Sequence, residues 1–245
     1  MAHLFGLIGK DIGYSRSPEL FQQFFAGAGV EAEYRLFDLP LITSITEVLA
    51  LQPAGLNVTQ PYKQAVIPWL DELDATAKAI EAVNTMAFTG QAVIGYNTDA
   101  IGFERALVPL LSSHHTKALI LGTGGAALAA AYACRQLGIT YRMVSRTPEE
   151  DQIGYDSVTP ELLATHTLLI QATPIGSARY ADERPPLPYF AITSKHLLFD
   201  MVYAPPITPF MRAGEEKGAV VTNGLTMLEE QAKAAWEIWR KFNFG

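Results

Sequence analysis

Residues 118 to 137 combine a short apolar run, a glycine-rich turn and a stretch of helical periodicity, and few folds accommodate that order. The segment reads Ala118-Leu-Ile-Leu121, then Gly122-Thr-Gly124-Gly125-Ala126-Ala127, then a helix expected over residues 128–137. Glycines let the backbone approach a pyrophosphate closely, and the N-terminus of the following helix favours its negative charge. The pattern is typical of a dinucleotide-binding βα unit. A plain glycine turn between strand and helix is the alternative.

The rest of the chain repeats the alternation of strand-like and helix-like segments. From Lys117 onward, Ala-Leu-Ile-Leu, Tyr-Arg-Met-Val, Leu-Leu-Ile-Gln and Leu-Leu-Phe-Asp read as strands with helices or loops between them. Such alternation indicates βαβ units and a parallel sheet, and so an α/β fold. Further strands are expected at 4–8, 33–39, 55–58, 83–88 and 92–96, the last two as a hairpin. Helices are expected at 18–28, 42–51, 64–69, 74–80, 100–111 and 226–242.

Charge and cysteine content exclude several classes of protein. The 245 residues carry a formal net charge of −7 without a long Lys/Arg run, which argues against nucleic acid or an acidic membrane surface as partner. No apolar run is long enough to span a membrane, and the N-terminus does not resemble a signal peptide. Cys134 is the single cysteine, so no intramolecular disulfide can form, and we expect it to be a small buried apolar residue. We therefore expect a cytoplasmic protein.

Two adjacent histidines, His114 and His115, invite a metal-binding interpretation. Neighbouring residues point apart on any regular element, and no cysteine or acidic partner lies close in sequence. We expect a solvated linker there and no metal site.

The nature of the dinucleotide is indicated by the residues after the next strand, which ends on Ser145-Arg146-Thr147. NAD-binding folds usually place an acidic residue near this position to hold the ribose hydroxyls. Two hydroxyls and a guanidinium suit a 2′-phosphate instead, so the sequence favours NADP over NAD. A solvated arginine in a turn is the alternative.

Hydrogen-bonding side chains recur where apolar segments end. Individually each is a cap or turn signal, and Ser17 before Pro18 reads as a helix N-cap. Several such ends on neighbouring elements suggest one cleft rimmed by amides and hydroxyls, which fits a ligand rich in OH groups. Ser15 and Ser17 would suit a carboxylate near a helix N-terminus. The other members are Asn57, Thr59, Asn84, Thr85, Asn97, Thr98 and Asp99.

The chain contains nine motifs in this order: Ser-Arg-Ser-Pro, Asn-Val-Thr-Gln-Pro-Tyr-Lys, Ala-Val-Asn-Thr, Asn-Thr-Asp-Ala-Ile-Gly, Gly-Thr-Gly-Gly-Ala, Ser-Arg-Thr, Ala-Thr-Pro-Ile-Gly, Asp-Met-Val-Tyr-Ala-Pro-Pro-Ile-Thr-Pro and Gly-Leu-Thr-Met-Leu-Glu-Glu-Gln-Ala. This is the order found in shikimate dehydrogenase, and the chain resembles the shikimate/quinate dehydrogenase family over essentially its whole length.

The resemblance implies a fold and an activity. Members reduce 3-dehydroshikimate reversibly to shikimate with NADPH, a step of chorismate and aromatic amino-acid biosynthesis. The implied fold is an α/β substrate domain (1–101), a Rossmann-like doubly wound NADP domain (102–225) and a C-terminal helix (226–245) that returns to the first domain, with the site in the cleft between domains. The expected partners are the small-molecule substrate and NADP(H), in a monomer or homodimer.

The resemblance also implies roles for individual residues. Lys63 and Asp99 match the catalytic pair. The substrate-binding set is Ser15, Ser17, Asn57, Thr59, Asn84, Tyr203 and Gln231. The cofactor-binding set is Gly122, Gly124, Gly125, Ala126, Ser145, Arg146, Thr147, Thr173, Met201, Gly224 and Met227.

Some positions depart from the family pattern. Gln171 replaces the usual Asn before Ala-Thr, and Ser145 replaces the usual Asn before Arg-Thr. The acidic run Glu149-Glu150-Asp151 follows where many NADP-using members place another basic residue, so NADP preference is expected to be modest. Two alternatives stay open at this point: a quinate/shikimate dehydrogenase with relaxed NAD/NADP use, and a non-catalytic nucleotide-binding homologue.

Overall fold

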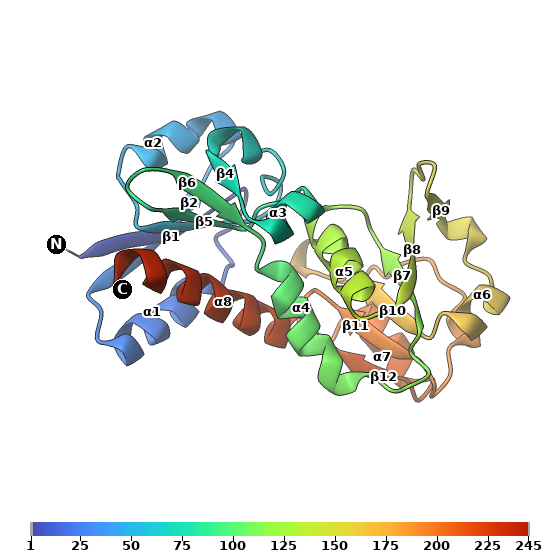
Figure 1. Cartoon of the computed structure of the whole chain (residues 1–245). Helices are drawn as coiled ribbons and strands as arrows, with labels where there is room; N and C mark the ends of the chain where they lie inside the picture. The colour runs from blue at the N-terminus through green and yellow to red at the C-terminus, as the bar shows by residue number, and fades with distance from the viewer. Residues whose placement is uncertain (1, 245) are drawn as a thin grey trace. The chain divides into compact units, whose positions relative to one another are not determined.

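The computed structural model of the chain describes residues 2–244. They form two compact units, each built around one six-stranded sheet. Unit 1 contains the chain up to Ile101 and the segment from Glu229 onward, and unit 2 contains Gly102–Leu228. Figure 1 follows the chain through both units by colour.

The sheet of unit 1 is mixed and has the strand order β2-β1-β3-β5-β6-β4. The first three neighbours are parallel, while β5 and β6 form the expected antiparallel hairpin beside β3. The strands are β1 (His3–Gly9), β2 (Ala32–Asp38), β3 (Gly55–Val58), β4 (Glu72–Leu73), β5 (Thr85–Phe88) and β6 (Val93–Tyr96).

Helices cover both faces of this sheet. Phe21 and Phe25 of α1 (Ser17–Ala28) and Trp239 of α8 (Leu225–Asn243) pack with Phe5 on one face. The other face packs against α2 (Ile45–Leu49) and α3 (Ala75–Ile80). In Figure 1, α1 and α8 lie below the sheet and α2 above it. The N-terminal segment and the C-terminal helix therefore share one core.

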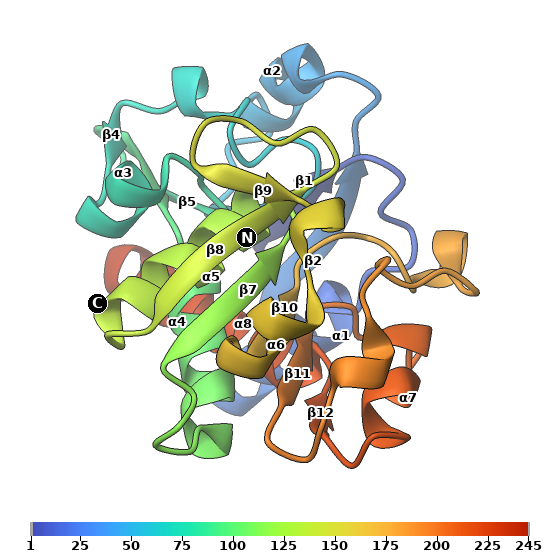
Figure 2. The same cartoon turned by 90° about the vertical axis from the view of Figure 1, so that its right-hand side faces the viewer.

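The sheet of unit 2 is parallel throughout, with the order β12-β11-β10-β7-β8-β9 (Figure 2). Its central strands are near-continuous apolar runs because a parallel sheet is buried on both faces. The strands are β7 (Lys117–Leu121), β8 (Thr140–Ser145), β9 (Gln152–Gly154), β10 (Leu168–Gln171), β11 (Leu197–Asp200) and β12 (Val220–Thr222).

Alternate residues of each strand in unit 2 face opposite helix layers, as a doubly wound sheet requires. Ala118 and Ile120 pack with α5 (Gly125–Gln136) and with Phe103 of α4 (Asp99–Leu107). Leu119 and Leu121 pack on the opposite face. That face is covered by α6 (Pro160–Thr165) and α7 (Pro209–Glu215). The predicted α/β class, with a Rossmann-like unit, is confirmed.

Several expected boundaries change in the structure. Residues 42–51 split into the 3₁₀ turn Ile42–Ser44 and α2, and only Ile67–Trp69 of 64–69 is helical, again as a 3₁₀ turn. The helix expected at 100–111 ends as α4 at Leu107 and continues as the 3₁₀ turn Val108–Leu110. The short strands β4, β9 and β12 were not predicted, because two or three residues carry no measurable periodicity.

Ser17 does not cap α1. The helix begins at Ser17 itself, its N-cap is Arg16, and no side-chain cap bond forms. The Ser17 hydroxyl is instead within 3.2 Å of Ser15 Oγ and contacts the buried phenol of Tyr34. The hydroxyl is thereby directed toward other polar side chains and away from the helix backbone.

Two further expectations concern single buried residues. Cys134 is fully buried, as predicted, and burial raises the pKa of its thiol to about 12. The solvated-linker prediction is wrong for His115, whose ring is 7% exposed and accepts a hydrogen bond from Ser112 N.

No helix among the described residues is long and apolar enough to cross a membrane.

Candidate active site

A buried ion pair between Lys63 and Asp99 is the most distinctive feature of unit 1. Lys63 lies on the turn after β3, and Asp99 is the first residue of α4. Lys63 Nζ donates to Asp99 Oδ2 at 2.5 Å, and the two side chains are only 15% and 8% exposed. Asn84 Nδ2 donates to the other carboxylate oxygen at 2.9 Å. Since both oxygens are held, the pair has a fixed direction, and the ammonium keeps two further N–H groups for a ligand.

A network of amides and hydroxyls supports this pair. Asn84 Oδ1 accepts from Thr98 N at 2.7 Å and from Thr85 Oγ1 at 3.2 Å. Thr85 Oγ1 in turn accepts from Asn57 Nδ2 at 3.1 Å, and Gln231 Oε1 lies 3.4 Å from Asn84 Nδ2. The antiparallel pairing of β3 and β5 sets Asn57 opposite Thr85, which explains why these two side chains meet. Five of the polar residues expected to form one cluster therefore do so in unit 1: Asn57, Asn84, Thr85, Thr98 and Asp99.

The other predicted substrate residues of unit 1 lie at the ends of β1 and β3. Ser15 and Ser17 follow β1, and Ser17 opens the helix α1. Thr59 directly follows β3 and donates its backbone N–H to Ile8 O at 2.8 Å. The Gln60–Pro61 peptide after it is cis. Asp99 is the first residue of α4, and in this first turn Asn97 Oδ1 accepts from Ala100 N.

In unit 2, the glycine turn between β7 and α5 has the form that a pyrophosphate needs. Gly122 has a φ of +117°, and a Cβ there would lie 3.0 Å from the Thr173 side chain, so only glycine fits. A Cβ at Gly124 would meet nothing within 4 Å, so the turn opens on free space. Gly124 is the N-cap of the twelve-residue helix α5, with Gly125 and Ala126 in its first turn. Backbone N–H groups and the helix dipole thus fit a phosphate group there.

The other predicted cofactor residues follow the carboxyl ends of neighbouring parallel strands. Ser145 ends β8, and its buried Oγ accepts from Thr147 N at 3.2 Å, which shapes the turn that exposes Arg146. Met201 follows β11, and Gly224 follows β12. A Cβ on Gly224 would lie 2.2 Å from Met201 O. In such sheets ligands bind at this edge.

Gln171, a departure from the family pattern, has a clear structural role. It is fully buried at the end of β10. Its Oε1 accepts from Thr173 N at 3.2 Å and from Thr173 Oγ1 at 3.0 Å, while Nε2 donates to Ile175 O. The longer amide therefore holds the turn that carries Thr173 next to Gly122.

Tyr203 and Met227 occupy different settings. Tyr203 is half-buried on the loop after β11, and Met227, in the first turn of α8, packs into the apolar core of unit 2 near Met201.

Asp200, just before the loop that carries Tyr203, was not predicted as a site residue. It accepts from Thr208 Oγ1 at 2.6 Å and from Val202 N at 2.9 Å, and burial raises the pKa of its carboxyl to about 7.

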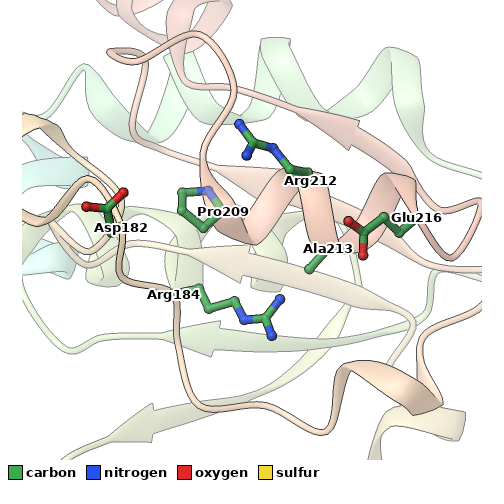
Figure 3. A pocket seen from close by; sticks show the side chains of 6 residues that line it. All are labelled: Asp182, Arg184, Pro209, Arg212, Ala213 and Glu216. Atoms are coloured by element: carbon green, nitrogen blue, oxygen red, sulfur yellow. The ribbon is translucent and has the colours of Figure 1, made fainter.

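A separate cavity of about 370 Å³ lies beside α7 (Figure 3). Its wall combines two carboxylates and two guanidiniums with Pro209 and Ala213, and it includes none of the predicted site residues. The charged members are Asp182, Arg184, Arg212 and Glu216. Within residues 2–244, no group of His, Cys, Asp or Glu side chains could hold a metal ion.

Sequence reasoning missed one residue of the polar network, Tyr34 on β2. Its phenol donates to Asn57 Oδ1 at 2.8 Å, and its side chain is 9% exposed. A single tyrosine within an expected strand gives no signal of such a role, because strands are rich in aromatic residues for packing reasons alone.

A Rossmann-like unit with a dinucleotide turn, in a chain that also carries a buried lysine–aspartate pair, defines a nicotinamide-dependent dehydrogenase of the α/β class. The family model described as "Shikimate dehydrogenase substrate binding domain" matches residues 7–86. The chain is 35% identical to the shikimate dehydrogenase (NADP(+)) of Lysinibacillus sphaericus, over 98% of this chain and 92% of that protein. It belongs to the shikimate dehydrogenase family.

Solved structures are similar over nearly their full length. A shikimate 5-dehydrogenase from Thermus thermophilus, in complex with NADP(H) and shikimate, superposes with a TM-score of 0.87 at 30% identity, covering 98% of this chain and 94% of that one. A quinate dehydrogenase from Corynebacterium glutamicum, in complex with NAD, gives a TM-score of 0.84 at 27% identity, covering 99% and 94%. The same fold is thus found in a shikimate dehydrogenase and in a quinate dehydrogenase.

Proposed function

We propose that this protein catalyses the reversible, NADP-dependent oxidation of shikimate to 3-dehydroshikimate. The observation that carries the proposal is the Lys63–Asp99 pair, buried and held by Asn84 in unit 1. A module that only binds nucleotide has no need of a buried ion pair at a polar site. NADPH, when bound at the glycine turn, supplies the hydride for the reductive direction.

The chain's own residues handle the proton. In the reductive direction, Lys63 Nζ donates a hydrogen bond to the substrate ketone oxygen, stabilises the negative charge that grows there and provides the proton. Asp99 holds the ammonium in place, and Asn84 holds Asp99. In the oxidative direction the step reverses, and the neutral amine of Lys63 accepts the single proton of the reacting hydroxyl while Asp99 holds the resulting ammonium.

The other predicted residues bind and orient. Ser15 and Ser17 hold the substrate carboxylate, Thr59 and Gln231 contact ring hydroxyls, and Tyr203 also belongs to the substrate-binding set. In unit 2 the glycine turn binds the pyrophosphate, and Ser145, Arg146 and Thr147 bind the 2′-phosphate. The proposal includes the division into a substrate domain (1–101), a cofactor domain (102–225) and a C-terminal helix. It also includes a cytoplasmic location and a monomeric or homodimeric state.

Replacing the lysine tests this assignment. We expect Lys63→Ala to fold normally and to lose roughly 10²- to 10⁴-fold in kcat with shikimate and NADP, because proton transfer and charge stabilisation are removed together. The matched control is Lys78→Ala, which removes an exposed lysine of α3 in the same unit. A folded Lys63→Ala protein with the turnover of the Lys78→Ala control would exclude Lys63 from the chemistry.

Quinate dehydrogenation with relaxed cofactor use is the second candidate. Two observations favour it: the structural similarity to an NAD-bound quinate dehydrogenase, and the exposed acidic run Glu149-Glu150-Asp151 directly after the Arg146 turn. Like charges near the expected 2′-phosphate weaken its binding. Comparison of shikimate with quinate under identical conditions separates the two candidates.

A further inference from the structure

Tyr34 is buried between two parts of the substrate site, although no substrate role follows from its place in the sequence. Its ring stacks on Phe21 of α1, with centroids 4.5 Å apart and planes 6° from parallel. Tyr34 pairs with Phe5 on β1, and Leu7 on β1 pairs with Asn57 on β3. Because strand side chains alternate, Tyr34 and Asn57 share one face of the sheet, and the phenol reaches across β1 to the amide.

The direction of the Tyr34–Asn57 hydrogen bond is fixed by the other partners of the amide. Asn57 Nδ2 donates to the carbonyl of Asn84 at 3.2 Å, and a carbonyl can only accept. The Oδ1 atom therefore faces the phenol, and Tyr34 Oη must be the donor, at 2.8 Å. With its single proton committed to Asn57, the phenol has only lone pairs left to present to the neighbouring Ser17 hydroxyl.

A one-way chain of donors runs from Tyr34 to the ion pair. Ser15 donates to Ser17, whose hydroxyl adjoins the Tyr34 phenol, and Tyr34 donates to Asn57. Asn57 Nδ2 then donates to Thr85, Thr85 to Asn84, and Asn84 to the carboxylate of Asp99. Both N–H groups of Asn57 are used inside the protein, so this amide can offer a substrate only a lone pair. Hydrogen bonds in such a chain polarise one another in a buried setting.

We infer that Tyr34 is a positioning residue for substrate binding, which joins the Ser15/Ser17 pair to the Asn57–Asn84–Asp99 network and fixes the orientation of both. The inference rests on the proposed function. Without the phenol, Asn57 Oδ1 loses its buried donor and the Ser17 hydroxyl loses its polar neighbour. Ser17 adjoins Tyr34 directly, whereas Asp99 lies several bonds further along the chain. Removal of the phenol should therefore weaken substrate binding more than it slows the chemical step.

The test is Tyr34→Phe, which keeps the ring and its stacking on Phe21. We expect the KM for shikimate to rise roughly 5- to 50-fold, the effect of one lost hydrogen bond to a buried polar group. We expect kcat to fall by less than about fivefold and the KM for NADP to stay within about twofold. The matched control is Tyr189→Phe in unit 2, which removes the same atom from a bond to Pro185 O. It should change neither KM.

A double variant separates positioning from general loosening of the fold. If Tyr34 acts through Ser17, the shikimate KM of Tyr34→Phe/Ser17→Ala should be close to that of Ser17→Ala alone, because the two changes break one connection. Fully additive effects would overturn the inference. So would a folded Tyr34→Phe protein with unchanged shikimate KM, or one in which the NADP KM rises equally.

The wild-type protein distinguishes failure of the inference from failure of the proposed function. If it shows no shikimate turnover with NADP, the proposed function fails and the inference with it. If it turns over shikimate and the Tyr34→Phe variant matches it, only the inference fails. Should Tyr34→Phe not fold, Thr85→Val breaks the chain beyond Asn57, next to Asn84 and Asp99. The inference then predicts a fall in kcat that exceeds the rise in the shikimate KM, and the opposite result would overturn it.

Discussion

Arg146 stands exposed on the turn that Ser145 and Thr147 shape after β8, where a guanidinium can reach a 2′-phosphate. The three carboxylates that begin two residues after Thr147 oppose the same anion. One charge-assisted hydrogen bond contributes about 1.5–3 kcal/mol. If Arg146 makes one such bond, it dominates the choice of dinucleotide despite its acidic neighbours.

We therefore expect Arg146→Ala to lower the ratio of kcat/KM with NADP to kcat/KM with NAD by about ten- to 150-fold. Most of the change should appear in the KM for NADP, because the 2′-phosphate takes no part in the chemistry. The matched control is Arg142→Ala, which removes an exposed guanidinium on β8 itself, before the turn that carries Arg146. An unchanged ratio would assign NADP selection to other residues.

The C-terminal helix α8 could be predicted from the sequence because its helical periodicity extends over a long segment. Residues 226–242 were expected to form one amphipathic helix, and the structure has Leu225–Asn243. Its buried face carries Trp239, which is fully buried and donates from Nε1 to Met86 O at 3.0 Å. The Trp239 ring also lies against Phe5, with centroids 4.9 Å apart. This residue ties the C-terminal helix to the core of unit 1.

Trp239→Ala should accordingly lower the free energy of unfolding by about 3–5 kcal/mol, the usual cost of removing a large buried aromatic ring. Urea denaturation followed by circular dichroism measures it. Phe242→Ala in the same helix, where the side chain is 39% exposed, should cost less than about 1 kcal/mol. Equal costs for the two variants would contradict the packing described for α8.

The sequence predicts long elements and motif positions well, and it fails where tertiary contacts decide. The parallel strands of unit 2 and the glycine turn appear where expected, because burial on both faces demands uninterrupted apolar runs. Ser17 was expected to cap a helix, yet its hydroxyl is directed to Ser15 and Tyr34, partners that no local pattern reveals. His115 was expected in solvent, yet it is buried against the Lys195 carbonyl, eighty residues away in sequence.

In the whole molecule, we expect Asp200 of unit 2 to have a strong effect on how the free energy of unfolding changes with pH. Burial raises its pKa from 3.8 to about 7, so between these values the folded protein binds a proton that the unfolded chain releases. Stability contributed by this group is therefore present at acid pH and falls as the pH rises toward 7, with no further change above it. The ionised form is the disfavoured one because hydrogen bonds from Thr208 and Val202 offset only part of its desolvation.

Asp200→Asn removes this titration and tests the sign. We expect the wild type to lose stability relative to the variant as the pH rises from 5 to 8, by about 1 kcal/mol or more given the size of the pKa shift. Urea midpoints at pH 5, 6.5 and 8 give the difference. Parallel pH profiles for the two proteins would mean that Asp200 titrates as an ordinary carboxyl.

The most direct test of the central claim measures nicotinamide absorbance while the purified protein is offered shikimate or quinate, each with NADP and with NAD. We predict that shikimate with NADP gives the highest kcat/KM of the four pairs. Quinate turnover equal to that of shikimate would favour the dual-substrate alternative. An absence of turnover with every pair, in a protein that still binds the dinucleotide, would contradict the assignment of Lys63 and Asp99 as a catalytic pair.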